Sequence, residues 1–118
     1  MLNRKKTSKH RKERSVRRCP LVASAEVVDV SSGTRLAARI SELGMGGCYV
    51  DALNPFLEGT AVILRIVRDS GSFEAKAKVV YVHHACGMGL SFTETSPEHR
   101  AILEEWLAEI ILQTVTAS

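Results

Sequence analysis

Short stretches of alternating apolar and polar residues fill the chain between residues 22 and 92, and they constrain its fold more than any other feature. The clearest stretch runs from Phe73 to Val82, where Phe73, Ala75, Ala77, Val79 and Tyr81 take every second position and Glu74, Lys76 and Lys78 stand between the first four of them. Because successive side chains of a strand point to opposite faces, this pattern predicts a strand with one buried face. The same alternation predicts that Tyr81 lies on that buried face.

Five further stretches have the length of a strand and end at residues that are typical of turns. They cover residues 22–30, 34–40, 48–53, 60–68 and 87–92. Short strands at this close spacing favour a closed antiparallel barrel, because closure removes the exposed edges that an open sheet would leave. We therefore predict an all-β fold, a six-stranded antiparallel β-barrel, in one domain, since 118 residues bury one modest core.

The end of the chain has a different period. Ser96 can cap a helix and Pro97 suits its first position. Six apolar residues then recur at helical spacing, with glutamates off their stripe: Ile102, Leu103, Trp106, Leu107, Ile110 and Ile111. We predict a C-terminal amphipathic helix that packs by this stripe on the barrel, with packing on a partner protein as the alternative.

Positive charge is concentrated at the start of the chain. Residues 1–18 carry nine Lys or Arg and one Glu, whereas the rest carries seven Lys or Arg and twelve acids. So few apolar side chains cannot offset the entropy of ordering, and we expect 1–13 to be a flexible basic tail, 14–112 the domain, and 113–118 a second tail. No apolar stretch has the length of a signal peptide or of a membrane span, so we expect a cytoplasmic protein that does not insert into membranes.

Cysteine and histidine spacing gives no sign of a metal site. Cys19, Cys48 and Cys86 are odd in number and form no CxxC pair, so we expect reduced thiols and no structural zinc. His83, His84 and Cys86 lie close in sequence, but neighbouring residues of a strand point to opposite faces. We expect no metal there.

The glycine-rich segment from Gly44 to Gly47 can adopt positive φ and allows a close approach of other groups to the backbone. It lacks the lysine and the strand-to-helix context of a nucleotide-hydrolysing loop. The chain also has no carboxylate pair, and no nucleophile beside a base, at a spacing that indicates catalysis. We therefore expect a binding module and not an enzyme.

The segment Arg14-Ser15-Val16-Arg17-Arg18 has an RxxxR spacing just before the first predicted strand. It resembles the motif that precedes the first strand in the PilZ family of small β-barrels. Asn54 to Thr60 resembles the family's proline and Gly-Thr turn, and Gly87 to Phe92 resembles its closing Gly-Met-Gly strand. The resemblance covers about residues 14–110 and implies the same barrel.

The second motif of the family, D/N-x-S-x-x-G, can be placed on this chain in two registers. In one register Ser41 and Gly44 match the serine and the glycine, and Arg39 stands at the acidic position. In the other, which we prefer, Glu42, Gly44 and Gly47 take the three positions. The second motif is then degenerate, since a glycine replaces the serine.

The resemblance implies one ligand, the bacterial second messenger cyclic diguanylate (cyclic-di-GMP), and no other cofactor. The implied ligand-binding residues are Arg14, Arg17, Arg18, Glu42, Gly44 and Gly47. Arg14 and Arg18 would be the main contacts, because a guanidinium can grip a phosphate or a guanine edge with two parallel hydrogen bonds and can also stack on a base. Glu42 would accept hydrogen bonds from guanine, and glycine at 44 would remove a hydroxyl bond worth about 1 kcal/mol.

Two other classes of function remain open. A PilZ-like domain with an eroded motif can act as an adaptor that binds a protein, here through the helix that carries Trp106 and Ile110. A basic tail on a small barrel can also bind nucleic acid through the phosphates. Stacking residues are scarce, with six aromatics in 118 residues, and the chain after the tail is acidic, so nucleic-acid binding ranks last.

Overall fold

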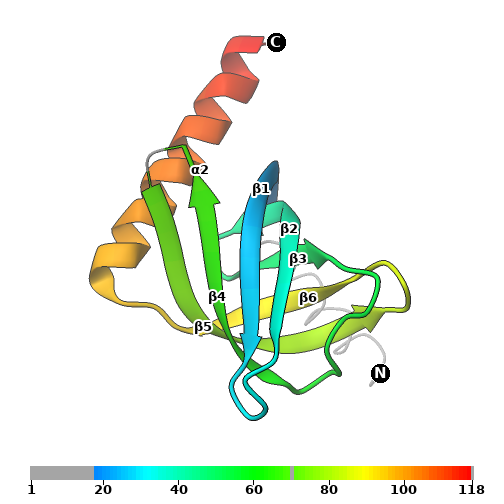
Figure 1. Cartoon of the computed structure of the whole chain (residues 1–118). Helices are drawn as coiled ribbons and strands as arrows, with labels where there is room; N and C mark the ends of the chain where they lie inside the picture. The colour runs from blue at the N-terminus through cyan, green and yellow to red at the C-terminus, as the bar shows by residue number, and fades with distance from the viewer. Residues whose placement is uncertain (1–17, 70, 118) are drawn as a thin grey trace, which may run out of the picture.

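A closed antiparallel barrel forms the body of the protein (Figure 1). The computed structural model describes residues 18–69 and 71–117, and within them six strands follow one another around the barrel in the order β1-β2-β3-β6-β5-β4. The strands are β1 (Arg18–Asp29), β2 (Arg35–Gly44), β3 (Gly47–Asp51), β4 (Ala61–Arg68), β5 (Gly71–His83) and β6 (Gly87–Glu94). The predicted six-stranded antiparallel barrel is therefore confirmed.

The inward faces of all six strands meet in one apolar core. β4 shows the alternation: Val62, Leu64 and Ile66 are buried, and the residues between them are exposed. The fully buried side chains of the barrel include Val27, Ile40, Leu43, Val50, Leu64, Phe73, Val79, Met88 and Leu90. Burial of this apolar surface drives closure of the sheet, because each such side chain contributes about 1.5–3 kcal/mol when it leaves water.

Tyr81 does not lie on the buried face of β5, so the prediction for this residue is wrong. Val79 pairs with Leu90 and Tyr81 pairs with Gly89, which leaves Val80 as an extra residue in β5. Such a β-bulge shifts the alternation by one position. Tyr81 therefore points outward, although it has the same parity in the sequence as the buried Phe73.

The glycine-rich segment forms a tighter connection than expected. Gly44 ends β2, Gly47 begins β3, and two residues connect them. Among the described glycines, positive φ occurs at Gly33 and Gly59, in other turns. The positive φ that the sequence allowed at residues 44–47 is therefore not used.

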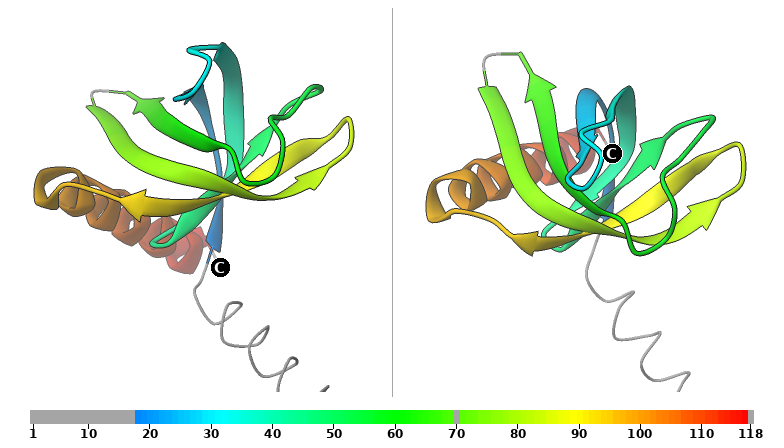
Figure 2. Two further views of the ribbon diagram at one scale, coloured as in Figure 1. Left: turned by 90° about the horizontal axis from the view of Figure 1, so that it is seen from below. Right: turned by 60° about the horizontal axis from the view of Figure 1, so that its bottom comes forward.

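Helix α2 (Pro97–Ala117) lies along the outside of the barrel, against β5 and β1 (Figure 2). The Ser96 hydroxyl accepts a hydrogen bond from the His99 N–H at 3.2 Å, which confirms Ser96 as the cap. The stripe packs on the barrel through Leu103, Trp106, Leu107 and Ile110. The helix continues through most of segment 113–118, to Ala117.

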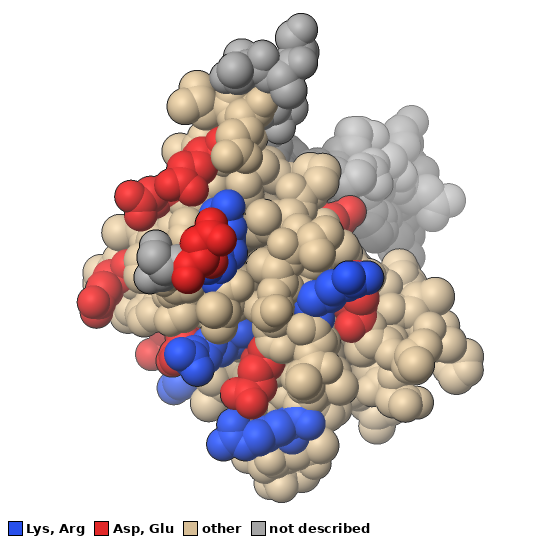
Figure 3. Space-filling view, turned by 45° about the horizontal axis from the view of Figure 1, so that its top comes forward, with Lys and Arg blue, Asp and Glu red and all other residues tan. Residues whose placement is uncertain are grey.

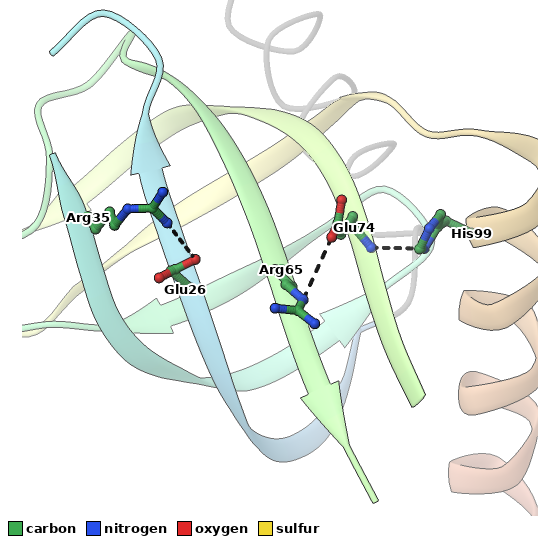
Figure 4. Close-up of polar contacts among 5 residues, drawn as sticks. All are labelled: Glu26, Arg35, Arg65, Glu74 and His99. Atoms are coloured by element: carbon green, nitrogen blue, oxygen red, sulfur yellow. Dashed lines mark hydrogen bonds and ion pairs between the residues drawn. The ribbon is translucent and has the colours of Figure 1, made fainter. Parts of the chain in front are cut away.

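Contacts of Trp106 and His99 fix the helix to the barrel. The centroid of the Trp106 ring lies 6.5 Å from that of the Phe73 ring. The Arg68 guanidinium lies over the Trp106 ring, 5.3 Å from its centroid. The Glu74 N–H donates to His99 Nδ1 at 3.0 Å (Figure 4). The first turns of α2 therefore have a defined position on β5.

The outer face of β1, β2, β4 and β5 carries both basic and acidic side chains, which form ion pairs between neighbouring strands. Glu26 and Arg35 are 3.2 Å apart, and Arg65 and Glu74 are 3.6 Å apart (Figure 4). Lys and Arg alternate with Asp and Glu over the face seen in Figure 3 and form no patch of one sign there. Exposed pairs of this kind contribute at most about 1 kcal/mol each.

None of the described helices is long and apolar enough to cross a bilayer.

Candidate functional site

One row of residues crosses five strands on the outside of the barrel. Pro20, Glu42, Tyr49, Gly89 and Tyr81 are successive register partners on β1, β2, β3, β6 and β5. The register shifts beside this row on three of the strands, between Pro20 and Ala23, between Ile40 and Glu42, and between Val79 and Tyr81. β-bulges are frequent at barrel rims and at functional sites, where they set the direction of particular side chains.

Arg18 lies over Gly47 at one end of this surface. Arg18 pairs with Gly44 in the sheet, and its Nη2 is 3.1 Å from the position that a Cβ on Gly47 would take. That Cβ would also collide with the carbonyl oxygen of Leu90. The close approach expected at this glycine is therefore confirmed, and the space that a side chain would fill is used by a guanidinium.

The structure thus brings together part of the predicted site. Arg18, Gly44 and Gly47 are neighbours, and Glu42 is exposed two residues before Gly44 on the same strand. Arg14 and Arg17 lie outside the described residues.

Three rings that were not predicted as ligand-binding residues form a cluster, and one of them, Tyr81, contacts Arg18. Arg18 Nη1 donates to the Tyr81 hydroxyl at 3.4 Å, and the Tyr81 ring centroid is 6.2 Å from that of Tyr49. The His83 ring lies 5.2 Å from Tyr81 and 5.6 Å from Tyr49. The Tyr49 hydroxyl is 3.1 Å from His83 Nδ1, within hydrogen-bond distance. An arginine therefore borders a cluster of three rings.

Tyr49 remains a neutral phenol at physiological pH. Burial of the group raises the pKa of Tyr49 above its ordinary value of 10.0, and the ionisable groups of Cys86, Tyr81, Asp51 and Glu42 act in the same direction. A neutral phenol is compatible with an anionic ligand, which a phenolate would repel.

A second cation lies across the sheet from Arg18. Gly47 pairs with Ser91 of β6, and Ser91 pairs with Lys78 of β5, so the three residues form the row next to the one described above. Lys78 is exposed. An anionic group over Gly47 would have a guanidinium on one side and an ammonium group further along the sheet, which makes this face suited to phosphate.

His83 belongs to this ring cluster. Within residues 18–69 and 71–117, no three His, Cys, Asp or Glu side chains gather in a way that could hold a metal ion.

A groove of about 570 Å³ lies next to the first residues of β1. It is mainly apolar and is lined by Cys19, Met45, Arg100, Glu104, Leu107, Ala108 and Ile111. The lining joins the rim of the barrel to one side of α2. Trp106 and Ile110, which the sequence analysis assigned to a partner in the adaptor hypothesis, are 7% exposed and pack on the barrel instead.

A small closed barrel with an external helix, and with Arg18 beside a ring cluster on its outer face, has the architecture of a β-barrel binding module. The model of the PilZ domain family matches residues 10–109, and the chain belongs to this family. No curated protein sequence gives a significant match.

Solved PilZ structures have the same fold. The PilZ domain of CeSA from a cellulose-synthesizing bacterium is 18% identical, with a TM-score of 0.61 over 76% of this chain and 93% of that one. The PilZ domain of Escherichia coli YcgR, solved with c-di-GMP, is 12% identical, with a TM-score of 0.70 over 83% and 91%. Bacillus subtilis MotI/DgrA, an inhibitor of motility, is 16% identical, with a TM-score of 0.70 over 81% of this chain and 50% of MotI.

Proposed function

We propose that this PilZ domain binds cyclic-di-GMP on the outer face of its barrel, through Arg18 and the segment from Glu42 to Gly47. The observation that supports this most strongly is the Arg18 guanidinium, which lies over a glycine that has no room for a side chain. Arg14 and Arg17 would add further contacts from the segment that precedes β1. The complex of the similar YcgR domain with c-di-GMP supports the same choice of ligand.

The residues supply the groups that this dianion requires. A guanidinium can donate two parallel hydrogen bonds to a phosphate or to the O6 and N7 atoms of guanine. The Glu42 carboxylate can accept from the N–H groups of a guanine edge. Gly44 offers no hydroxyl, so this chain has to replace one hydrogen bond of the family motif with another interaction.

We further propose that the domain is a sensor module of the cytoplasm and has no catalytic activity of its own. Its free cysteines fit a reducing compartment, and its ligand is a bacterial intracellular messenger by family resemblance.

Isothermal titration of the full chain with cyclic-di-GMP tests the proposal. The native chain should release or absorb measurable heat, and Arg18→Ala should weaken binding by about 10- to 100-fold, since a hydrogen bond to a charged group contributes about 1.5–3 kcal/mol. Arg14→Ala should weaken it as well, and the double variant should show no heat. Arg35→Ala, which removes a cation paired with Glu26 on another part of the barrel, is the matched control and should bind as the native chain does. A native chain that gives no heat would exclude cyclic-di-GMP.

The second candidate is an adaptor that acts through contact with another protein. The groove between α2 and the barrel rim favours it, because apolar side chains line an open surface there. MotI, which shares the fold, is by its name an inhibitor of motility. A photoreactive residue at Ala108, inside the groove, should then crosslink a defined partner in cells, and the same residue at Glu105, outside the groove, should not. Equal crosslinking at both positions, or none at either, would reject this surface.

A further inference from the structure

The rings of Tyr49 from β3 and Tyr81 from β5 lie over strand β6, which is between those two strands. We call this pair of residues the tyrosine platform. The Cβ that Gly89 lacks would collide with the Tyr81 ring, and the Cβ that Gly87 lacks would lie 2.7 Å from the Tyr49 hydroxyl. Each ring therefore covers a different glycine of the same strand. Their planes differ by 28° and their centroids are 6.2 Å apart, so the two rings are roughly parallel and offset from each other.

Part of each tyrosine remains exposed, beside the His83 ring that flanks both of them. Tyr49 and Tyr81 are half-buried, because β6 covers the face that lies on the glycines. The hydroxyls have partners within the protein: Tyr81 accepts from Arg18, and Tyr49 lies against His83. These contacts hold the rings in place, and an ordered aromatic surface loses little conformational entropy when a ligand stacks on it.

The charged groups around the platform suit a guanine nucleotide better than an apolar peptide. Two acids, Glu42 and Asp51, lie near Tyr49, where a carboxylate can accept from the N–H groups of a guanine edge, and two cations lie on the side of Tyr81. Arg18 contacts Tyr81 directly, and Lys78 lies on the same outer face of β5. A base that stacked on the rings would place its phosphate within reach of these cations. An apolar peptide side chain would gain nothing from them and would leave them partly desolvated.

We propose that the tyrosine platform stacks one base of a purine nucleotide, whose phosphate is held by Arg18. The identity of that nucleotide as cyclic-di-GMP rests on the function proposed above. Stacking here would supply the interaction that compensates for the hydroxyl absent at Gly44.

Calorimetry of tyrosine variants separates stacking from a simple role in positioning Arg18. Tyr49→Leu and Tyr81→Leu should each weaken cyclic-di-GMP binding by about tenfold or more, the usual effect of removing an aromatic ring from a base. Tyr81→Phe keeps the ring and removes the bond to Arg18, so it should retain most of the affinity that Tyr81→Leu loses. If the phenylalanine variant binds as weakly as the leucine variant, or if both leucine variants bind as the native chain does, stacking is overturned. Thermal unfolding of each variant confirms that it is folded.

A second probe keeps this inference independent of the choice of ligand. Guanosine monophosphate, followed by NMR, should shift the ring resonances of Tyr49 and Tyr81, whereas ribose 5-phosphate, which has no base, should not. If cyclic-di-GMP gives no heat but guanosine monophosphate shifts the rings, the platform stands and the proposed messenger is wrong. If cyclic-di-GMP binds and neither ring responds to either nucleotide, the platform is wrong and the proposed messenger stands.

Discussion

Gly47 has no room for a side chain, because the Leu90 carbonyl and the Arg18 guanidinium lie next to its Cα. A methyl group there would collide with the carbonyl and would lie about as close to Arg18 Nη2 as a hydrogen-bond partner, at 3.1 Å. Either the sheet or the arginine would have to move. The position of Arg18, and therefore the site, depends on this residue.

Gly47→Ala should lower the free energy of unfolding by about 1–3 kcal/mol, the usual cost of an added methyl in a packed structure, and should weaken cyclic-di-GMP binding. Urea unfolding and calorimetry measure the two effects. Gly71→Ala is the control, because a Cβ there meets only Trp106 at 3.9 Å, an ordinary contact. A Gly47→Ala protein as stable as the Gly71→Ala protein, with native affinity, would show that this close approach is unimportant.

Cys48 provides a pH-dependent test of the core. Burial raises the pKa of the Cys48 thiol from 9.0 to about 12, against the opposing effect of the Arg18 charge. The folded chain therefore keeps a proton that the unfolded chain loses above pH 9. The contribution of this group to stability is complete below pH 9 and decreases as the pH rises towards 12.

The free energy of unfolding of the native chain should accordingly fall more steeply above pH 9 than that of Cys48→Ala, by up to about 1.4 kcal/mol per pH unit. Urea titrations at pH 8, 9, 10 and 11 would measure the difference between the two slopes. Cavity formation in the variant lowers its stability at every pH and does not affect the comparison. Parallel curves would mean that the thiol ionises as easily in the folded chain as in the unfolded one.

Some residues of the candidate site could be predicted from short stretches of sequence, and others could not, because their orientation depends on pairing with a distant strand. Arg18, Glu42, Gly44 and Gly47 were predicted because two short motifs contain them, and the structure places them on one face of the barrel. Tyr81 was assigned to the core because one extra residue, Val80, cannot be recognised as a bulge until the partner strand is known. A local signal for the platform did exist in Gly87 and Gly89, since glycines two apart in a strand often mark a close approach of another group.

Among the elements, helix α2 is fixed to the barrel by a buried stripe in which Trp106 is the largest side chain. Its ring packs near Phe73 and under the Arg68 guanidinium and is 7% exposed. Ile111, on the groove side, is 44% exposed. The two positions should therefore differ widely in their contribution to stability.

Trp106→Ala should lower the free energy of unfolding by about 3–5 kcal/mol, as expected when a large buried ring is removed. Ile111→Ala should lower it by less than about 1 kcal/mol. Circular dichroism is the suitable signal, because Trp106 is the single tryptophan of the chain and its fluorescence disappears with the substitution. Equal losses for the two variants would show that α2 is not attached through its tryptophan stripe.

Strand positions followed from the sequence more accurately than strand ends. All six strands and the helix occur where alternation, helical spacing and turn residues predicted them. β1, however, begins at Arg18, four residues before the predicted start, and β2 extends to Gly44. The two extensions pair with each other in the sheet, and this pairing stabilises both. That pairing joins the arginine to the glycine segment, and no local pattern of residues could indicate it.

For the whole molecule, closure of the barrel is what assembles the site. The row from Pro20 to Tyr81 draws one residue from each of five strands, and it exists only once the sheet is in register. The charge of the chain is also uneven. The basic residues are concentrated up to Arg18, and the rest of the chain has an excess of acids. A dianion would therefore be attracted to the end of the molecule where β1 begins.

Amide NMR spectra of the full chain, recorded during addition of cyclic-di-GMP, would locate the ligand on the barrel. The largest shifts should fall on Gly44, Gly47 and Gly89, which border Arg18 and the tyrosine platform, and Ala108 in the α2 groove should remain unchanged. Shifts confined to the groove, or spectra that do not change at all, would contradict the claim that the outer face of β1, β2, β3, β5 and β6 is the ligand site.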